Sequence, residues 1–431
     1  MRFRLSSLSK GSILSDSLWQ IGGSIANRSS YFATLVILSG ILSSKEYGIF
    51  GLLYSLVNSI ASVNSSGLGI PNRRILVRTS QIEESQILRF SLVIIGFLSI
   101  LLPLFVALYY RATNQQSPFN LIYWLHIIHL AFNFSVTLYL SYHYGGLREF
   151  VSYNRLLLPI NILLPLIILM FPLKSIDWAC VIISSITLLG NIVQILHLKK
   201  RGEIVSRSSV RESEYGFLGF VQKNYLSWLP CFLQSLLGLP VFFILQLNIT
   251  NKWGNLALIG VITLSTQLLN ISNIFAAKML SVFSPRISIQ YQKQGRISLS
   301  YFFKLLTFYM GIIILISLVL ILLLPIFFQI TGGNFFSNIY EIRYFILLNI
   351  LSCLLWFFQE YLHSINMSSF SLFVNLIFSI SLLSLFFVSY YHRYSFSLID
   401  YANCIGGARI ISILFCLVIL YFYGKICKVS I

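Results

Sequence analysis

Four basic residues inside apolar segments are the side chains of this sequence best suited to binding chemistry. Arg28 and Arg409 fall near the middle of long apolar stretches, and Lys223 and Lys278 fall nearer one end of theirs. A charge at the centre of a bilayer costs about 3 kcal/mol on insertion scales, so a ligand or a buried partner must offset it. A guanidinium holds two phosphate oxygens at once. The four cations therefore predict a site for a phosphate-bearing ligand.

Uncharged polar side chains follow the same helical faces as these cations. At the α-helical step they form stripes on four apolar segments. We expect these stripes to line one cavity, formed by Gln20, Ser24, Asn27, Tyr31, Asn58, Ser62, Asn224, Gln267, Asn270 and Asn273. The alternative is structural, because Ser, Thr, Asn and Gln also hydrogen-bond neighbouring helices to one another in lipid.

Each cation also has an alternative interpretation. Arg28 pairs with an acid or with backbone carbonyls in that case, and Arg409 pairs with Asp400, Tyr401 or Asn403 on its own helix. Both lysines instead extend to the cytoplasmic interface. Acidic residues lie mostly in loops, and Glu360 is the main exception, which makes it the candidate for coupling transport to an ion.

The composition places the chain in the membrane. Of its 431 residues, 57% are hydrophobic and only 10% are charged. Such a balance is typical of a polytopic membrane protein and not of a soluble domain. The formal net charge of +18 does not indicate nucleic-acid binding, because most of the charge lies in short loops, where it sets topology.

The elements that position the cations are helices long enough to cross a bilayer, which needs about 20 apolar residues. We predict an all-α polytopic fold with about twelve such helices, at 18–42, 48–70, 88–110, 121–144, 154–171, 177–198, 221–248, 255–283, 301–328, 342–364, 369–391 and 401–424.

Two halves of six helices follow from this order. We predict an N-terminal lobe at 1–198, a basic cytoplasmic linker at 199–215 and a C-terminal lobe at 216–431. Both halves begin with a long helix, a Gly-containing turn and a polar-striped helix. Equal orientation of the halves predicts a pseudo-two-fold axis along the membrane normal, with a central cationic cavity.

Lysine and arginine counts predict the topology. Eighteen lie in the loops and termini of one side, and six lie on the other, namely Lys45, Arg111, Lys174, Lys252, Arg343 and Arg393. The positive-inside rule then places both termini in the cytoplasm.

No cofactor or metal is predicted. The six cysteines form no C-x-x-C pair, and His126 and His129 have no carboxylate or thiol beside them in the sequence. No Gly-rich phosphate loop, serine triad or zinc signature is present, so we expect no enzymatic activity.

Two segments carry a resemblance to a known family. The turn Leu42-Ser43-Ser44-Lys45-Glu46-Tyr47-Gly48 and the segment Asn64-Ser65-Ser66-Gly67-Leu68-Gly69, with Ser284-Pro285-Arg286 later, resemble the polysaccharide flippases of the multidrug/oligosaccharidyl-lipid/polysaccharide exporter superfamily. The sequence departs from the family pattern at Ser43-Ser44, where Gly-Pro is usual, and lacks the acid before Gly67.

This resemblance implies a multi-pass flippase of the bacterial inner membrane. Its implied substrate is an undecaprenyl-pyrophosphate-linked oligosaccharide for O-antigen or capsule assembly, with membrane lipid, a polysaccharide polymerase and a chain-length regulator as partners. By position, Arg28 would correspond to the first-helix arginines of such flippases.

Two other functions remain open at this point. An ion-coupled exporter of small molecules with the same fold would depend on a titrating acid such as Glu360 or Asp16. A membrane enzyme such as a polymerase would need a larger extramembrane loop or an acidic catalytic motif, which the short outer loops do not offer.

Overall fold

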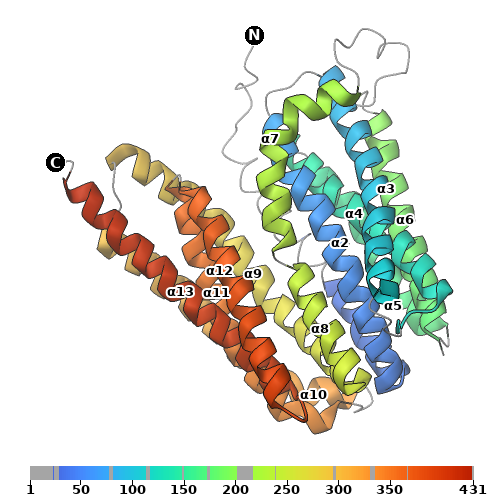
Figure 1. Ribbon diagram of the computed structural model, residues 1–431. Coiled ribbons are helices and arrows are strands. Elements are labelled where there is room, and N and C mark those ends of the chain that lie inside the picture. Colours follow the sequence, from blue (N-terminus) through green and yellow to red (C-terminus); the bar gives the residue numbers. More distant parts are fainter. Residues whose placement is uncertain are drawn as a thin grey trace. The chain divides into compact units, whose positions relative to one another are not determined.

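The structure is a computed structural model of the chain. It describes Gly23 and residues 29–76, 81–112, 117–147, 150–171, 175–200, 217–237, 239–294, 298–330, 335–365 and 367–429. All regular elements in this part are helical (Figure 1). A short helix spans Ser29–Ile41. The others are α2 (Ser44–Leu76), α3 (Gln81–Ala112), α4 (Leu121–Gly146), α5 (Phe150–Met170), α6 (Ile176–Lys200), α7 (Phe217–Leu236), α8 (Leu239–Trp253), α9 (Leu256–Gln294), α10 (Leu299–Ile330), the 3-10 turn η2 (Phe336–Asn338), α11 (Ile339–Ser364), α12 (Ser368–His392) and α13 (Leu398–Val429).

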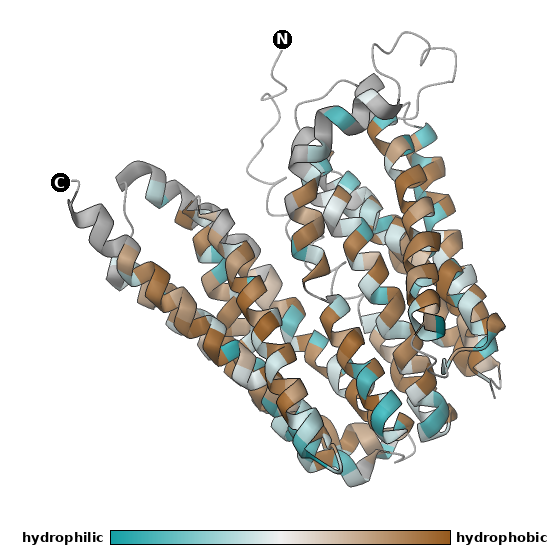
Figure 2. Ribbon diagram, viewed as in Figure 1, coloured by the Kyte–Doolittle hydropathy of each residue, from teal (hydrophilic) through white to brown (hydrophobic). Residues whose placement is uncertain are grey.

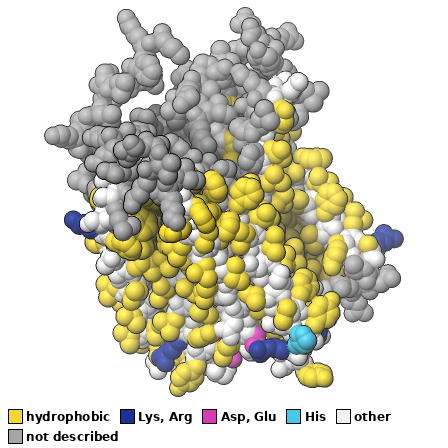
Figure 3. All heavy atoms as spheres, turned by 60° about the vertical axis from the view of Figure 1, so that its left-hand side comes forward, with side chains coloured by type: hydrophobic (Ala, Val, Ile, Leu, Met, Phe, Trp, Pro, Cys, Tyr) yellow, Lys and Arg dark blue, Asp and Glu magenta, His cyan; other side chains and the backbone are white. Residues whose placement is uncertain are grey.

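The prediction of an all-α polytopic membrane fold is confirmed. Ten spans among the described helices are long and apolar enough to cross a membrane. Apolar residues run along most helices (Figure 2), and hydrophobic side chains are spread widely over the described part of the face drawn in Figure 3. Long exposed apolar side chains such as Phe97 of α3 and Leu322 of α10 fit contact with lipid.

Two predicted spans differ from the structure in detail. The segment predicted at 221–248 is two helices, α7, which ends at Leu236, and α8, which begins at Leu239. Pro240 follows directly, and proline removes a backbone donor and favours a break there. The other case is α2, which is long but is not one of the ten spans, because its serines and asparagines lower its hydropathy.

The contacts divide the chain into two compact units. Unit 1 contains residues 1–41 and 53–240, and unit 2 contains residues 42–52 and 241–431. The predicted linker, 199–215, lies outside the described residues apart from Lys199 and Lys200. The predicted lobes, their pseudo-two-fold axis and the central cavity stay predictions.

In unit 1, α4 contacts α3, α5 and α6. The end of α2 joins this group through a buried cluster that contains Leu68, Tyr139 and Trp228. Gly67 faces the ring of Phe232 on α7, and a Cβ there would meet the ring at 2.5 Å. The Gly67-Leu68 pair of the family-like segment therefore has a packing role.

In unit 2, α11 contacts α9, α10, α12 and α13. The start of α2 belongs to this unit and is fixed by a capping box, in which the Ser43 amide donates to Glu46 Oε2 at 3.0 Å and the Glu46 amide donates to Ser43 Oγ at 3.3 Å. Tyr47 is fully buried against Phe335. A Cβ on Gly48 would collide with the backbone carbonyl of Leu256. The residues that resemble the family therefore lie where the start of α2 approaches the start of α9 closely.

Candidate functional site

Of the four cations predicted for the site, Arg409 is the one whose side chain the structure describes. It lies on α13, eleven residues after the start and thirteen before the end of the span Leu398–Phe422. The side chain is half-buried, and its Nη1 atom is buried with no hydrogen-bond partner among the described residues. Such an atom is costly unless something binds it, which makes Arg409 a candidate anion site.

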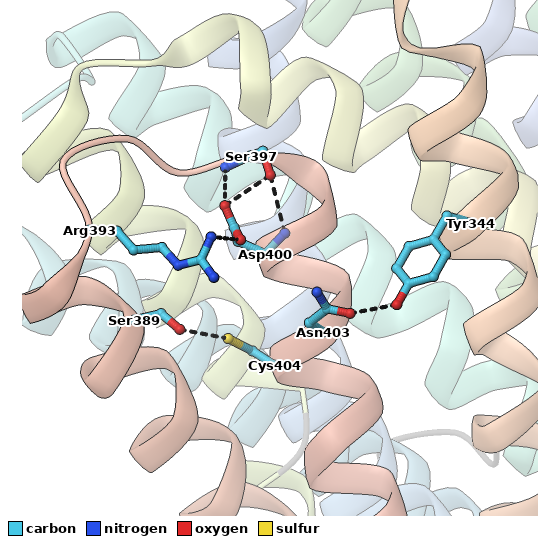
Figure 4. A network of polar contacts seen from close by, with 7 residues as sticks. All are labelled: Tyr344, Ser389, Arg393, Ser397, Asp400, Asn403 and Cys404. Atoms are coloured by element: carbon cyan, nitrogen blue, oxygen red, sulfur yellow. Dashed lines mark hydrogen bonds and ion pairs between the residues drawn. The ribbon is translucent and has the colours of Figure 1, made fainter.

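The acid on the same helix does not neutralise Arg409. Asp400 accepts from the guanidinium of Arg393, in the turn between α12 and α13, and from the amide and hydroxyl of Ser397, both at 2.9 Å (Figure 4). Asn403 instead accepts from the Tyr344 hydroxyl at 2.6 Å. Of the three alternative partners, only Tyr401 is an electrostatic neighbour of Arg409.

Neutral polar side chains surround this part of unit 2. The Cys353 thiol and the Tyr401 hydroxyl are electrostatic neighbours of Arg409. Cys353 adjoins a network in which buried Asn349 donates to Ser272 Oγ at 3.0 Å and to Asn273 Oδ1 at 2.9 Å. These groups polarise the site without cancelling its charge, so an anion is the ligand that fits it.

Three predicted lining residues lie on α9 in unit 2. Gln267 accepts from the amide of Asn270 at 3.1 Å, and Asn273 joins the Asn349 network. All three are half-buried. Within the span of α9, 67% of the residues are buried, against 22% for α3 and for α10. The stripe therefore lies on a helix that is largely shielded from lipid.

Three further predicted lining residues lie on the first two helices. The Tyr31 hydroxyl is 3.1 Å from Thr187 Oγ1, and the Tyr31 ring lies edge-on to Phe134. Asn58 and Ser62 of α2 are half-buried. Tyr31 thus makes a contact between helices of unit 1, as the structural alternative expects for such residues.

The remaining predicted site residues cannot be placed in contact with anything described. Gln20, Ser24, Asn27 and Arg28 lie outside the described residues. Lys223 and Asn224 lie on α7, and Lys278 lies on α9, but the structure describes only their backbone. Their part in the site stays a prediction.

The prediction missed the polar residues that hold unit 1 together. Asn72 of α2 donates to Ser91 at 2.8 Å and accepts from the Trp228 indole at 3.0 Å. Asn64 donates to Ser99 at 3.1 Å and to Ser135 at 3.0 Å. Asn64 lies in the second predicted segment beside the stripe, whereas Asn72 lies just beyond the predicted end of that segment at residue 70, so hydropathy and periodicity gave no signal for Asn72.

Glu360, the candidate for ion coupling, and the pair His126 and His129 lie in different surroundings. Glu360 is half-buried near the end of α11. His126 is 3.3 Å from Asp177, a carboxylate that the sequence did not place beside it, and His129 is 2.9 Å from the Ser184 hydroxyl. The two histidines therefore serve two different contacts.

Comparison with known proteins identifies the fold. No family model matches the chain, and no curated protein matches it either. Among solved structures, the inward-facing conformation of a multidrug resistance MATE family transporter of the MOP superfamily aligns over 96% of this chain and 98% of its own, with a TM-score of 0.68 and 15% identity. The MATE multidrug transporter DinF-BH gives a TM-score of 0.59 and 14% identity over 97% of both chains. The outward-facing conformation of a multidrug resistance MATE family transporter gives 0.57 and 15%, covering 97% of this chain and 95% of its own.

The chain therefore has the fold of MATE transporters of the MOP superfamily. This supports the resemblance at the level of the fold. At 14–15% identity the likeness carries no substrate.

Proposed function

We propose that this protein is a flippase that moves undecaprenyl-pyrophosphate-linked oligosaccharide units across the bacterial inner membrane for O-antigen or capsule assembly. The observation that carries the proposal is the mid-span guanidinium of Arg409 with its unpartnered nitrogen among the described residues. A pyrophosphate head group cannot enter hydrocarbon without countercharge. A half-buried guanidinium supplies that charge and a geometry that matches two phosphate oxygens.

The distribution of acids supports an anionic substrate. Of the five acidic side chains that the structure describes, Glu46, Asp177, Glu341 and Asp400 lie in the first turn of a helix, and Glu360 lies near the end of α11. None of these five is near the middle of a described span. A site for cationic substrates would be expected to hold a carboxylate at that depth, since buried charges are paired.

The predicted cations outside the described side chains extend this proposal. Arg28, Lys278 and Lys223 would add positive charge for the second phosphate, and Gln20, Ser24, Asn27 and Asn224 would hydrogen-bond the first sugar. The long isoprenoid chain would stay in lipid while the head group crosses, as the site opens alternately to either side.

A second candidate function is an ion-coupled exporter of small molecules. Two observations favour it: the similar solved structures are multidrug transporters, and the half-buried Glu360 forms no ion pair or hydrogen bond through its carboxylate among the described residues. In that case Glu360 would bind and release the coupling ion.

A binding experiment separates the two functions. Purified protein in nanodiscs is titrated with undecaprenyl pyrophosphate, with undecaprenol as the uncharged control and with a rhodamine dye as a cationic drug. We expect undecaprenyl pyrophosphate to bind and Arg409→Gln to weaken it at least tenfold, which corresponds to about 1.4 kcal/mol. The matched control Arg111→Gln removes an exposed charge at the end of α3 and should leave binding unchanged.

Two results would overturn the flippase proposal. One is equal affinity for undecaprenyl pyrophosphate and undecaprenol. The other is binding of the rhodamine dye that disappears in Glu360→Gln and persists in Arg409→Gln, which would favour the exporter.

The inner-membrane orientation has its own test. In a background without native cysteines, cysteines at the exposed positions Lys45 and Tyr394 should react with an impermeant thiol reagent added to intact cells, and a cysteine at Lys200 should not. The reversed pattern would contradict the cytoplasmic placement of both termini.

A further inference from the structure

A pocket of about 750 Å³ lies on unit 2 along the first turns of α10, beside Phe283 of α9. Its described lining is Phe283, Tyr301, Phe303, Lys304, Leu305, Thr307 and Phe308. The volume is within the range of ligand sites, about 300–1,000 Å³. The proposed transport function does not use this pocket.

The walls of the pocket are apolar and its one described cation lies at the surface. Phe283 and Phe308 form one wall, with ring centroids 6.2 Å apart. Phe303 and Phe308 are 52% and 58% exposed, so they also face the surroundings of the helix. Lys304 is exposed and has no ion-pair partner among the described residues, while Tyr301 and Thr307 add two hydroxyls.

The position of Lys304 matches the membrane interface. It lies four residues after the start of the span Ser300–Gln329, which corresponds to a depth of about 6 Å along a helix. At that depth a lysine ammonium meets lipid head groups, and the ring of Phe308 one turn further in, with Phe283 beside it, meets acyl chains.

The surrounding sequence carries only positive charge. Between Glu214 and Glu341 the chain has no acidic residue, and the stretch from Lys278 to Lys304 contains Arg286, Lys293 and Arg296 as well. This stretch therefore attracts an anion at this end of unit 2. The described acid at the matching end of α11, the helix packed here, is Glu360, next to Tyr361, whose ring centroid lies 4.8 Å from that of Phe302. Basic pockets between transmembrane helices are typical sites for anionic lipid head groups.

We propose that this pocket binds one anionic phospholipid of the bilayer. The phosphate lies at Lys304 with the hydroxyls of Tyr301 and Thr307, and one acyl chain lies between the rings of Phe283, Phe303 and Phe308. The apolar walls select an amphiphile over a soluble anion, and the lysine selects an anionic head group over a zwitterionic one.

Lipid retention by the purified protein tests the proposal. Full-length protein is exchanged into mixed micelles of phosphatidylglycerol and phosphatidylcholine, and bound lipid is counted by native mass spectrometry. We expect selective retention of phosphatidylglycerol and a loss of about fivefold in Lys304→Gln, the factor for one basic residue near a membrane surface. The control Lys252→Gln changes a lysine that lies over the rings of Trp253 and Tyr390, and it should retain the lipid.

A second variant tests the acyl-chain part of the site. Thr307→Trp places a large ring at an exposed lining position, where folding should tolerate it, and it should reduce retention of both lipids. Glycerol 3-phosphate, which has the head-group charge without a chain, should not displace phosphatidylglycerol.

Three outcomes would overturn the proposal. They are equal retention of the two lipids, unchanged retention in Lys304→Gln, and displacement of phosphatidylglycerol by equimolar undecaprenyl phosphate, which would assign the pocket to the substrate. None of these outcomes depends on Arg409, so this inference and the flippase proposal fail separately.

Discussion

The polar interiors of the two units differ in charge. In unit 1, Asn64, Asn72 and Asn133 bind side chains on other helices, and Asn72 reaches Trp228, 156 positions along the chain. In unit 2, Asn349 makes a similar network with Ser272 and Asn273, but Arg409 adds a cation near it.

Unpartnered atoms also differ between the units. In the described part of unit 1, some buried polar atoms also lack a hydrogen bond, and most of them belong to uncharged side chains such as Gln194. Two others belong to His126 and Asp177, which contact each other. In unit 2 the buried Nη1 of Arg409 lies at mid-span, whereas Arg343, with an unpartnered Nε among the described residues, lies near the start of α11 over the Tyr340 ring. The neutral polar residues of unit 1 thus have partners on other helices, whereas the mid-span cation of unit 2 has a buried nitrogen without a hydrogen-bond partner among the described residues.

The largest expected effect on stability is at Asn72. Asn72→Leu keeps the branching of the side chain at Cγ but leaves the Trp228 indole and the Ser91 hydroxyl without their partner, so we expect the free energy of unfolding to fall by about 2 kcal/mol. Unfolding of the purified protein in SDS, followed by circular dichroism, measures this change. An effect below about 0.5 kcal/mol would mean that the unit 1 network does not stabilise the fold.

The same substitution at Arg409 should have the opposite sign. Arg409→Leu removes a partly desolvated charge, so we expect the free energy of unfolding to rise by about 1 kcal/mol while undecaprenyl pyrophosphate binding is lost. The SDS titration is repeated on this variant. A loss of stability similar to that of Asn72→Leu would show that Arg409 has a structural partner and would remove the contrast between the units.

A smaller loss is expected at Trp228. Trp228→Phe keeps an aromatic ring in the unit 1 core but removes the indole donor to Asn72, which should lower the free energy of unfolding by about 1 kcal/mol. Combining it with Asn72→Leu should give less than the sum of the two losses, because both remove the same hydrogen bond. Strict additivity would argue that the 3.0 Å contact contributes nothing.

The smallest effect is expected at Thr263 in unit 2. Its Oγ1 is buried without a hydrogen-bond partner among the described residues, so Thr263→Val should change the free energy of unfolding by less than about 0.5 kcal/mol, or raise it. Thr137→Val in unit 1 is the matched comparison, because Thr137 Oγ1 donates to Asn191 Oδ1 at 2.8 Å. This variant should lower the free energy of unfolding more than Thr263→Val does. A larger loss of stability in Thr263→Val than in Thr137→Val would contradict the assignment of Thr137 as hydrogen-bonded and Thr263 as unbonded.

The all-helical membrane fold class and most of the helices could be predicted from the sequence. Hydropathy is a sum over neighbouring residues, so the apolar segments at 121–144 and 177–198 could be read directly and agree with α4 and α6. The start of α2 differs from the prediction, because a turn was expected at Leu42–Gly48 before a helix at 48–70, whereas α2 begins at Ser44. The available signal was the spacing of Ser43 and Glu46, three residues apart, whose capping contacts are local. The polar stripe of α9 followed from the helical period in the same way.

Only the tertiary structure decided which polar side chains become partners. Asp400 lies on the same helix as Arg409 and was a reasonable partner for it, yet the fold of the α12–α13 turn brings Arg393 to Asp400 instead. Asn72 and Trp228 meet because α2 and α7 pack together in unit 1. Such partners depend on distances between helices that are far apart along the chain, and local periodicity contains no information about those distances. The packing therefore decided that Asn72 binds partners on other helices and that Nη1 of Arg409 has no hydrogen-bond partner among the described residues.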